Sequence, residues 1–230
     1  LSVLITILWV VGITNAINLI DGLDGLATGV STIALTTMLV MAIIDMQVIA
    51  AYLAVVIIGA NLGFLYHNFY PAKIYMGDTG SNFLGYMIAV ISMLGLFKNV
   101  AILGFIIPVI ILAVPIFDTL FAIIRRAKTN QGIMQPDNKH IHYQLIRAGF
   151  THRQSVIIIY LFSIMFGILA IIFARASLFI SLFVSLLAFI LVHILAEFAG
   201  IVMDGKRPVV DTILRLLGRK GKTHNINEQE

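Results

Sequence analysis

The chain has 230 residues, of which 60% are hydrophobic and 11% are charged, and its formal net charge is +4. Soluble domains carry about 25% charged residues, and the mean hydropathy of +1.03 excludes a soluble globular protein. The absence of cysteine excludes disulfide bonds and thiolate metal sites. The composition predicts an all-α integral membrane protein.

Apolar runs predict about seven transmembrane helices, because a helix needs about 20 apolar residues to cross the hydrocarbon core. In chain order the predicted spans cover residues 1–17, 26–44, 48–65, 83–96, 100–124, 155–173 and 178–196. The sequence starts at Leu1 inside an apolar run and lacks the features of a signal peptide. We therefore expect an N-terminally truncated chain whose first spans are missing.

The positive charges lie on one side of this predicted topology. Thirteen of the 15 Lys and Arg residues fall in the breaks at 18–25, 66–82, 125–154 and 197–230. Only Lys98 and Arg175 fall in breaks on the other side. Because an excess of Lys and Arg marks the cytoplasmic side, all of the larger polar segments are predicted to be cytoplasmic.

This pattern predicts a single polytopic membrane domain followed by a tail. The domain covers residues 1–203 and contains a long cytoplasmic loop at 125–154. The tail at 204–230 is basic and mixes positive charges with aliphatic residues. That mixture favours a short interfacial helix on anionic lipid.

The motif NAINLIDGLDGL, at residues 15–26, closes the first apolar run. Its polar side chains are spaced three residues apart: Asn15, Asn18, Asp21 and Asp24. A helix end and a turn, with Asp24 capping the next helix, would explain one Asp and one Gly but not the two amides. Polar groups at a membrane helix end are costly to bury, so we interpret this motif as functional.

A second motif, MGDTGSN, occupies residues 76–82. One interpretation is a tight turn in which Asp78, Thr79 or Ser81 caps a helix that starts at Phe83. The alternative is a Mg²⁺ and phosphate site, because a carboxylate on a glycine-rich turn at a helix start suits both ions. The motif is not a P-loop, since it lacks the GxxxxGK[ST] pattern.

The third motif, PDNKHIHY, lies at residues 136–143 within the long loop. The positive-inside rule accounts for Arg125 and Arg126 but not for the clustered His140 and His142. No HExxH pattern or third spaced ligand accompanies them, which argues against zinc. Contacts to a diphosphate or a sugar fit these side chains better.

Polar residues outside the three motifs leave alternatives open. Asp118 shares a helical face with Arg125, and a functional role and a packed acid are equally supported. His193 and Glu197 are spaced i, i+4 and are predicted to form a structural pair. Three polar residues either line a site or anchor the chain at the interface with neighbouring aromatic residues; these are His67, Asn68 and Lys73.

The three motifs, in this order and on one predicted side, resemble those of the polyprenyl-phosphate N-acetylhexosamine-1-phosphate transferases of glycosyltransferase family 4. The resemblance rests on NxxNxxDGxDGL, MGDxGS and the histidine loop, and it covers about residues 9–155. The HIHY form of the loop, followed by RAGFTHRQ, is more similar to the GlcNAc-1-phosphate branch than to the muramoyl-pentapeptide branch. Residues 1–203 would then form the transferase domain.

The resemblance implies a role for each matching residue. Asp78 is expected to bind Mg²⁺ with Asn18 near the metal, and Asp24 is expected near the nucleotide. Together the expected catalytic residues are Asp21, Asp24 and Asp78. The expected substrate-binding residues are Asn15, Asn18, Asp24, His140, His142, Arg125 and Arg126.

The implied reaction transfers GlcNAc-1-phosphate from UDP-GlcNAc to undecaprenyl phosphate, giving undecaprenyl-diphospho-GlcNAc and UMP. It would be the first lipid-linked step of a cell-wall or surface glycopolymer such as a teichoic acid. The expected cofactor is Mg²⁺, with Mn²⁺ as an alternative, and the expected location is the bacterial plasma membrane with a cytoplasmic active site. Membrane lipid is an expected partner, nucleic acid is not, and a homodimer is left open.

One departure from the family pattern is that these 230 residues contain no adjacent Asp–Asp pair. Truncation explains its absence, and it leaves open whether the fragment is active alone. The alternatives are the phospho-N-acetylmuramoyl-pentapeptide transferase branch and a non-catalytic membrane paralogue. A transporter is disfavoured, because it predicts polar groups at mid-bilayer and inverted repeats.

Overall fold

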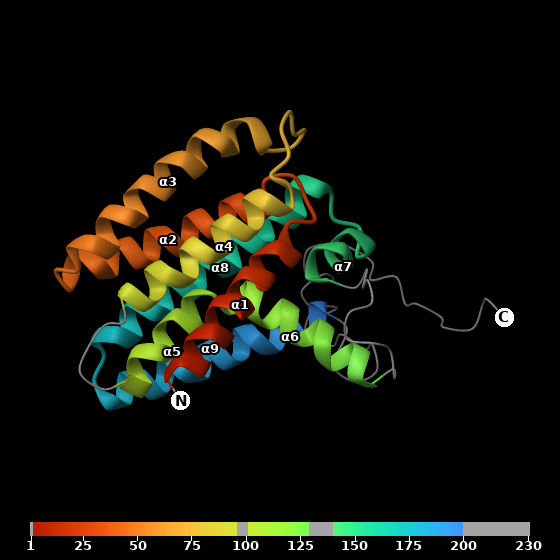
Figure 1. The fold of residues 1–230 in the computed structure, drawn as a ribbon. Helices are drawn as coiled ribbons and strands as arrows, with labels where there is room; N and C mark the ends of the chain where they lie inside the picture. The colour runs from red at the N-terminus through yellow and green to blue at the C-terminus, as the bar shows by residue number, and fades with distance from the viewer. Residues whose placement is uncertain (1, 96–100, 129–139, 200–230) are drawn as a thin grey trace.

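A computed structural model describes residues 2–95, 101–128 and 140–199, and throughout these ranges the regular structure is helical (Figure 1). The helices are α1 (Ser2–Ile20), α2 (Leu26–Ile44), α3 (Val48–Asn68), α4 (Gly77–Leu94), α5 (Ala101–Ile111), α6 (Ala113–Lys128), α7 (Ile141–Arg147), α8 (His152–Arg175) and α9 (Leu178–Phe198). The predicted basic tail, the first half of the PDNKHIHY motif (136–139) and the domain boundary at 203 lie outside the described residues.

The all-α membrane fold is confirmed. Five of the described helices are long and apolar enough to cross a membrane, namely α1, α2, α3, α8 and α9. Helix α4 differs from the predicted span at 83–96, because it begins at Gly77 and takes in the polar residues 77–82. Those residues lower the hydropathy of its first turns, so α4 does not meet the same criterion.

The predicted span at 100–124 is a broken helix. Residues Phe105–Ile111 and Ala113–Ala127 are bent by 84° at Leu112, and the pair counts as at most one span. The cause is Pro115, which has no N–H to donate to the carbonyl of Ile111 and whose ring crowds the preceding turn. By length and apolarity the described residues therefore supply five candidate spans, or six if this bent pair is one span.

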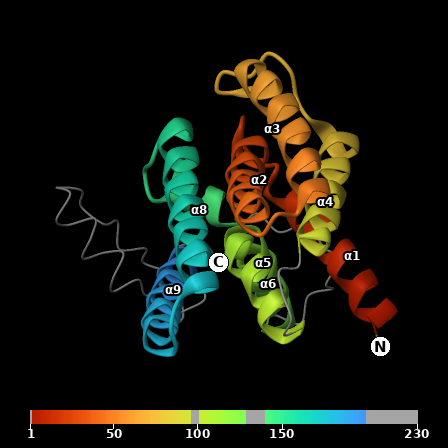
Figure 2. The ribbon, with the colours of Figure 1, turned by 90° about the vertical axis from the view of Figure 1, so that its left-hand side faces the viewer.

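The helices pack around α2. Figure 2 shows α8 and α9 on one side of α2 and α5, and α1, α3 and α4 on the other. Helix α2 packs against α3 and α8, and α1 packs against α4. Helices α1 and α3 end, and α2, α4 and α8 begin, at one end of the bundle, which we call the motif end (Figure 1).

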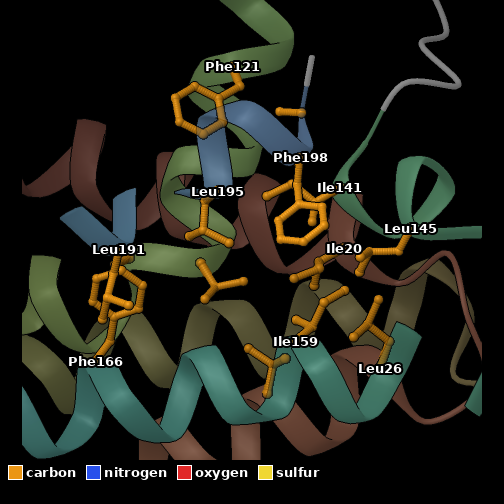
Figure 3. Packing of buried hydrophobic residues seen from close by; sticks show 14 of the residues in the cluster. Ile20, Leu26, Phe121, Ile141, Leu145, Ile159, Phe166, Leu191, Leu195 and Phe198 are labelled. Atoms are coloured by element: carbon orange, nitrogen blue, oxygen red, sulfur yellow. The ribbon is translucent and has the colours of Figure 1, made fainter. Parts of the chain in front are cut away.

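A hydrophobic cluster holds the short helix α7 against the bundle (Figure 3). Ile141 and Leu145 of α7 are 2% and 0% exposed and belong to the same cluster as Leu26 of α2 and Ile159 of α8. Burying two such side chains contributes roughly 3–6 kcal/mol. The C-terminal part of the predicted loop at 125–154 is therefore a packed helix rather than a free loop.

Helices α1 and α4 approach each other closely. The Trp9 indole N–H donates to Ser92 Oγ at 2.9 Å within this contact. A Cβ added at Gly85 would lie 2.7 Å from the Cα of Thr14, which is a backbone atom and cannot move alone. This close approach also sets the distance between the end of α1 and the start of α4 at the motif end.

We predict that Gly85→Ala destabilises the bundle by about 1–3 kcal/mol, because the added methyl group forces α1 and α4 apart. The measurement is thermal unfolding in detergent micelles. Gly63→Ala is the matched control, because Gly63 is exposed on α3 and a Cβ there meets nothing within 4 Å. The control should lose no stability, and an equal loss in both variants would contradict the prediction.

Candidate functional site

The motif end gathers the described parts of all three sequence motifs. NAINLIDGLDGL spans the end of α1, a turn at 21–25 and the start of α2. MGDTGSN forms the start of α4, and the histidines lie at the start of α7. The predicted convergence of the three motifs at one end of the bundle therefore agrees with the structure.

The turn at 21–25 is held by side chains from two other helices. Gly25 has φ 78°, a conformation that glycine adopts without strain. Its N–H donates to the Asn68 carboxamide oxygen at 3.1 Å, and the Tyr160 hydroxyl donates to its carbonyl. Asp24 does not cap α2; its Oδ2 instead accepts from the backbone N–H of Ala72 at 2.9 Å.

The start of α4 brings the second motif onto the first. Because α4 begins at Gly77, Asp78 lies in its first turn, and the interpretation of a helix that starts at Phe83 is wrong. Asn18 Nδ2 donates to Ser81 Oγ at 2.7 Å and lies 3.4 Å from Asp78 Oδ1. Asn18 and Asp78, the predicted metal residues, are therefore neighbours.

A second carboxylate, that of Asp21, lies near enough to Asp78 to be affected by its charge. Burial, and secondly the negative charge of Asp78, raise the pKa of Asp21 from 3.8 to about 6. Asp78 itself is exposed at the surface. Two acids that repel each other form a site in which a cation would relieve the repulsion.

The oxygen atoms of this cluster fit Mg²⁺. Asp21 and Asp78 supply carboxylates, and among the described residues no donor is bonded to the amide oxygen of Asn18. Within the described part of the chain, no three His, Asp or Glu side chains form a complete metal-binding group. Mg²⁺ usually completes its shell with waters and substrate phosphate, so a few protein oxygens suffice.

The two histidines pack against the first motif. His142 is 1% exposed, its ring is parallel to that of His140 within 4°, and the ring centroids are 5.7 Å apart. A Cβ added at Gly22 would lie 2.2 Å from His142 Nε2. Only glycine therefore leaves room for this ring beside the turn that carries Asp21 and Asp24.

Asp118 pairs with a histidine rather than with Arg125. Its Oδ2 lies 2.8 Å from His140 Nδ1, and its Oδ1 accepts the Ile141 N–H at 2.9 Å. Arg125 donates to the carbonyl of Ala199 at the end of α9, at 3.0 Å. The shared face of Asp118 and Arg125 therefore does not produce an ion pair between them.

The remaining predicted residues lie around this core. Arg126 is 9% exposed on α6, and Asn15 is exposed on α1 one turn before Asn18. His193 Nε2 lies 3.5 Å from Glu197 Oε1, which agrees with the predicted structural pair. The assignment of individual catalytic and substrate-binding roles stays a prediction.

Sequence reasoning missed two residues that shape the site. Tyr160 lies in the middle of an apolar helix, and no signal in the sequence links it to Gly25. Asn68 was left between a site residue and an interfacial anchor. Its position at the end of a predicted span, ten residues before Asp78, was a usable signal, because polar groups at membrane helix ends need partners.

We predict that stability falls at acidic pH through His142. Burial lowers the pKa of His142 from 6.5 to about 4, so the unfolded chain binds more protons between these values. The neutral His142 ring contributes its full share of the folding stability above about pH 6.5. This share is lost as the pH falls towards 4, and the free energy of unfolding is lower by roughly 2 kcal/mol at about pH 5. Thermal unfolding should record this loss, and His142→Phe should reduce it. The same fall in both proteins would contradict the prediction.

Comparisons with known proteins agree with the motifs. Residues 1–96 match the family model described as glycosyl transferase family 4. The chain is 51% identical, over 94% of its length, to the probable undecaprenyl-phosphate N-acetylglucosaminyl 1-phosphate transferase of Bacillus subtilis. It is 37% identical, over 75% of its length, to the decaprenyl-phosphate N-acetylglucosaminephosphotransferase of Mycolicibacterium smegmatis. It is 38% identical, over 74%, to the phospho-N-acetylmuramoyl-pentapeptide-transferase of Anoxybacillus flavithermus.

The chain spans 60% of the length of the Bacillus relative and about half the length of the other two. The similarity to the Bacillus relative nevertheless extends over 94% of this chain. The motifs, the multi-pass helical fold and the match of residues 1–96 to glycosyl transferase family 4 agree with one another.

Proposed function

We propose that the full-length protein transfers GlcNAc-1-phosphate from UDP-GlcNAc to undecaprenyl phosphate, releasing UMP. The observation that carries the proposal is the cluster of Asn18, Asp21 and Asp78 beside a buried histidine pair at one end of a membrane bundle. Such a cluster suits a reaction between two anions. The names of the Bacillus and Mycolicibacterium relatives both specify a polyprenyl phosphate and an N-acetylglucosamine phosphate.

The GlcNAc branch is favoured over the muramoyl-pentapeptide branch. The chain is 51% identical to the Bacillus relative and 38% identical to the muramoyl-pentapeptide relative. The reaction forms a bond from an oxygen of the lipid phosphate to the β-phosphorus of UDP-GlcNAc. It breaks the bond from that phosphorus to the bridging oxygen, which leaves with UMP.

The main task of the protein is to bring these two anions together. Asn18 and Asp78, with Asp21 beside them, would hold Mg²⁺, or Mn²⁺ in its place. When bound, the metal supplies positive charge that neutralises the diphosphate. A lipid phosphate is already a nucleophile, so these residues need to position the reactants and balance charge more than to remove a proton.

The chain's own residues have distinct tasks in this proposal. Asp24, fixed by the Ala72 N–H, lies near the nucleotide, and Asn15 extends the polar face of α1. His140 and His142, with Arg125 and Arg126, contact the sugar-phosphate end of the donor. The motif end faces the cytoplasm of a bacterium, where the soluble nucleotide sugar is available, and the lipid tail enters between spans.

The experiment that tests the proposal is UMP release by the purified full-length protein from UDP-GlcNAc. The assay is run with and without undecaprenyl phosphate and with and without Mg²⁺. Release that needs both is expected. Release only with the muramoyl-pentapeptide nucleotide would move the protein to the other branch. No release with either donor would favour a non-catalytic paralogue.

We predict that Asp78→Asn lowers UMP release by about 100-fold or more, because the amide removes the charge that would hold the metal. The rate is measured per folded protein. Asp45→Asn is the matched control, because Asp45 is an acid at the opposite end of the bundle, paired with Arg175. Near-normal Mg²⁺-dependent release by Asp78→Asn would contradict the metal assignment.

A further inference from the structure

We propose that Asp118 is a positioning residue, which holds His140 in the tautomer with its proton on Nδ1 and leaves Nε2 for the substrate. The inference rests on the proposed function, in which His140 contacts the donor. Neither the three sequence motifs nor the comparisons assign a role to Asp118. It lies on α6, 22 residues before His140.

The contacts of Asp118 specify this tautomer. A carboxylate only accepts hydrogen bonds, and Asp118 uses one oxygen for the Ile141 N–H and the other for His140 Nδ1. His140 must therefore carry its proton on Nδ1 to donate to Oδ2. The second ring nitrogen, Nε2, is then an acceptor to which a substrate hydroxyl can donate.

Burial makes this arrangement rigid. Asp118 is 3% exposed and His140 is 5% exposed, so water competes little for the bond between them. A buried carboxylate without a partner is strongly unfavourable, and within the described residues His140 is the basic side chain that pairs with it. Removing Asp118 takes away the buried partner of His140 Nδ1, and removing His140 leaves Asp118 with the Ile141 N–H as its remaining bond.

His140 is linked to the first motif through its packing against His142. His140 precedes α7 directly, and its ring stacks on His142. His142 in turn lies against Gly22, between Asp21 and Asp24. Asp118 therefore fixes one side of the site from within the bundle, although α6 contributes no residue to the acidic cluster.

A purely structural role, in which Asp118 only fixes the start of α7, makes a different prediction for Asp118→Asn. The amide oxygen can still accept the Ile141 N–H, so the helix keeps this bond. The amide nitrogen can only donate, so His140 must accept on Nδ1 and carry its proton on Nε2. The substitution keeps the shape and reverses the tautomer, which lowers kcat strongly where a histidine acts through one defined nitrogen.

The first measurement is UMP release by the full-length protein carrying Asp118→Asn. We expect kcat to fall by about 100-fold while KM changes by less than about threefold and the melting temperature stays within a few degrees. Adding His140→Gln to this variant should lower kcat little further. Glu197→Gln is the matched control, because Glu197 is a fully buried acid beside His193, and its kcat should stay near that of the wild type.

The second measurement is the ¹⁵N NMR spectrum of the histidine-labelled protein, in which His140→Gln identifies the signals of His140. The expected result is a proton on Nδ1 in the wild type and on Nε2 in Asp118→Asn. This measurement needs no turnover. If the wild type releases no UMP, the proposed function fails and the NMR spectrum alone decides the tautomer.

Three results would overturn the positioning role. The first is a wild-type His140 that carries its only ring proton on Nε2. The second is a stable Asp118→Asn protein with near-normal kcat. The third is a loss of kcat in Asp118→Asn that follows a fall in melting temperature and equals the loss in Asp118→Ala, which is the result that a structural cap predicts.

Discussion

The site depends on how the peptide of Gly25 is held. This residue joins the turn that carries Asp21 and Asp24 to helix α2, and both of its backbone polar groups are bonded to side chains of other helices. Asn68 at the end of α3 binds the N–H, and Tyr160 of α8 binds the carbonyl. A turn of this kind at a membrane boundary has unpaired backbone groups, and an unpaired polar group is expensive away from water. The two side chains solve that problem and fix the turn in one orientation.

Asn68 extends this constraint to the segment before α4. Its oxygen also accepts from the Thr28 hydroxyl at 3.0 Å, and its nitrogen donates to the carbonyl of Ile74 at 2.9 Å. The bond from the Ala72 N–H to Asp24 is a second link between the first motif and this segment. Residues 69–76 therefore connect the first motif to the second, and the distance between Asp21 and Asp78 follows from backbone geometry. Burial, and secondly the repulsion from Asp78, raise the pKa of Asp21, and a bound cation would offset that repulsion.

The sequence predicted the parts of this molecule that follow from hydropathy and local spacing. The span at 26–44 has the same bounds as α2, because Gly25 and Asp45 interrupt an apolar run on both sides. Hydropathy did not predict the break at Leu112, since Ile111 and Val114 are as apolar as the rest of the span and only Pro115 marks the bend. It also missed the early start of α4, because the residues of MGDTGSN are typical of turns and become helical through contacts with Asn18. The Asp118–His140 and Tyr160–Gly25 contacts join residues 22 and 135 positions apart, and no periodic pattern specifies such pairs.

The position of α7 changes how the histidine motif is understood. In the sequence, His140 and His142 lie in a long polar loop, which suggests side chains that reach the substrate by loop movement. In the structure, Ile141 lies between the two histidines in the chain and is 2% exposed in the core cluster. This buried side chain therefore anchors both histidines to the bundle. Opening α7 would expose Ile141 and Leu145 and would break both bonds of Asp118, at a cost of several kcal/mol. The histidines are therefore held in place before the substrate binds. Any movement that admits the substrate has to come from another side of the site.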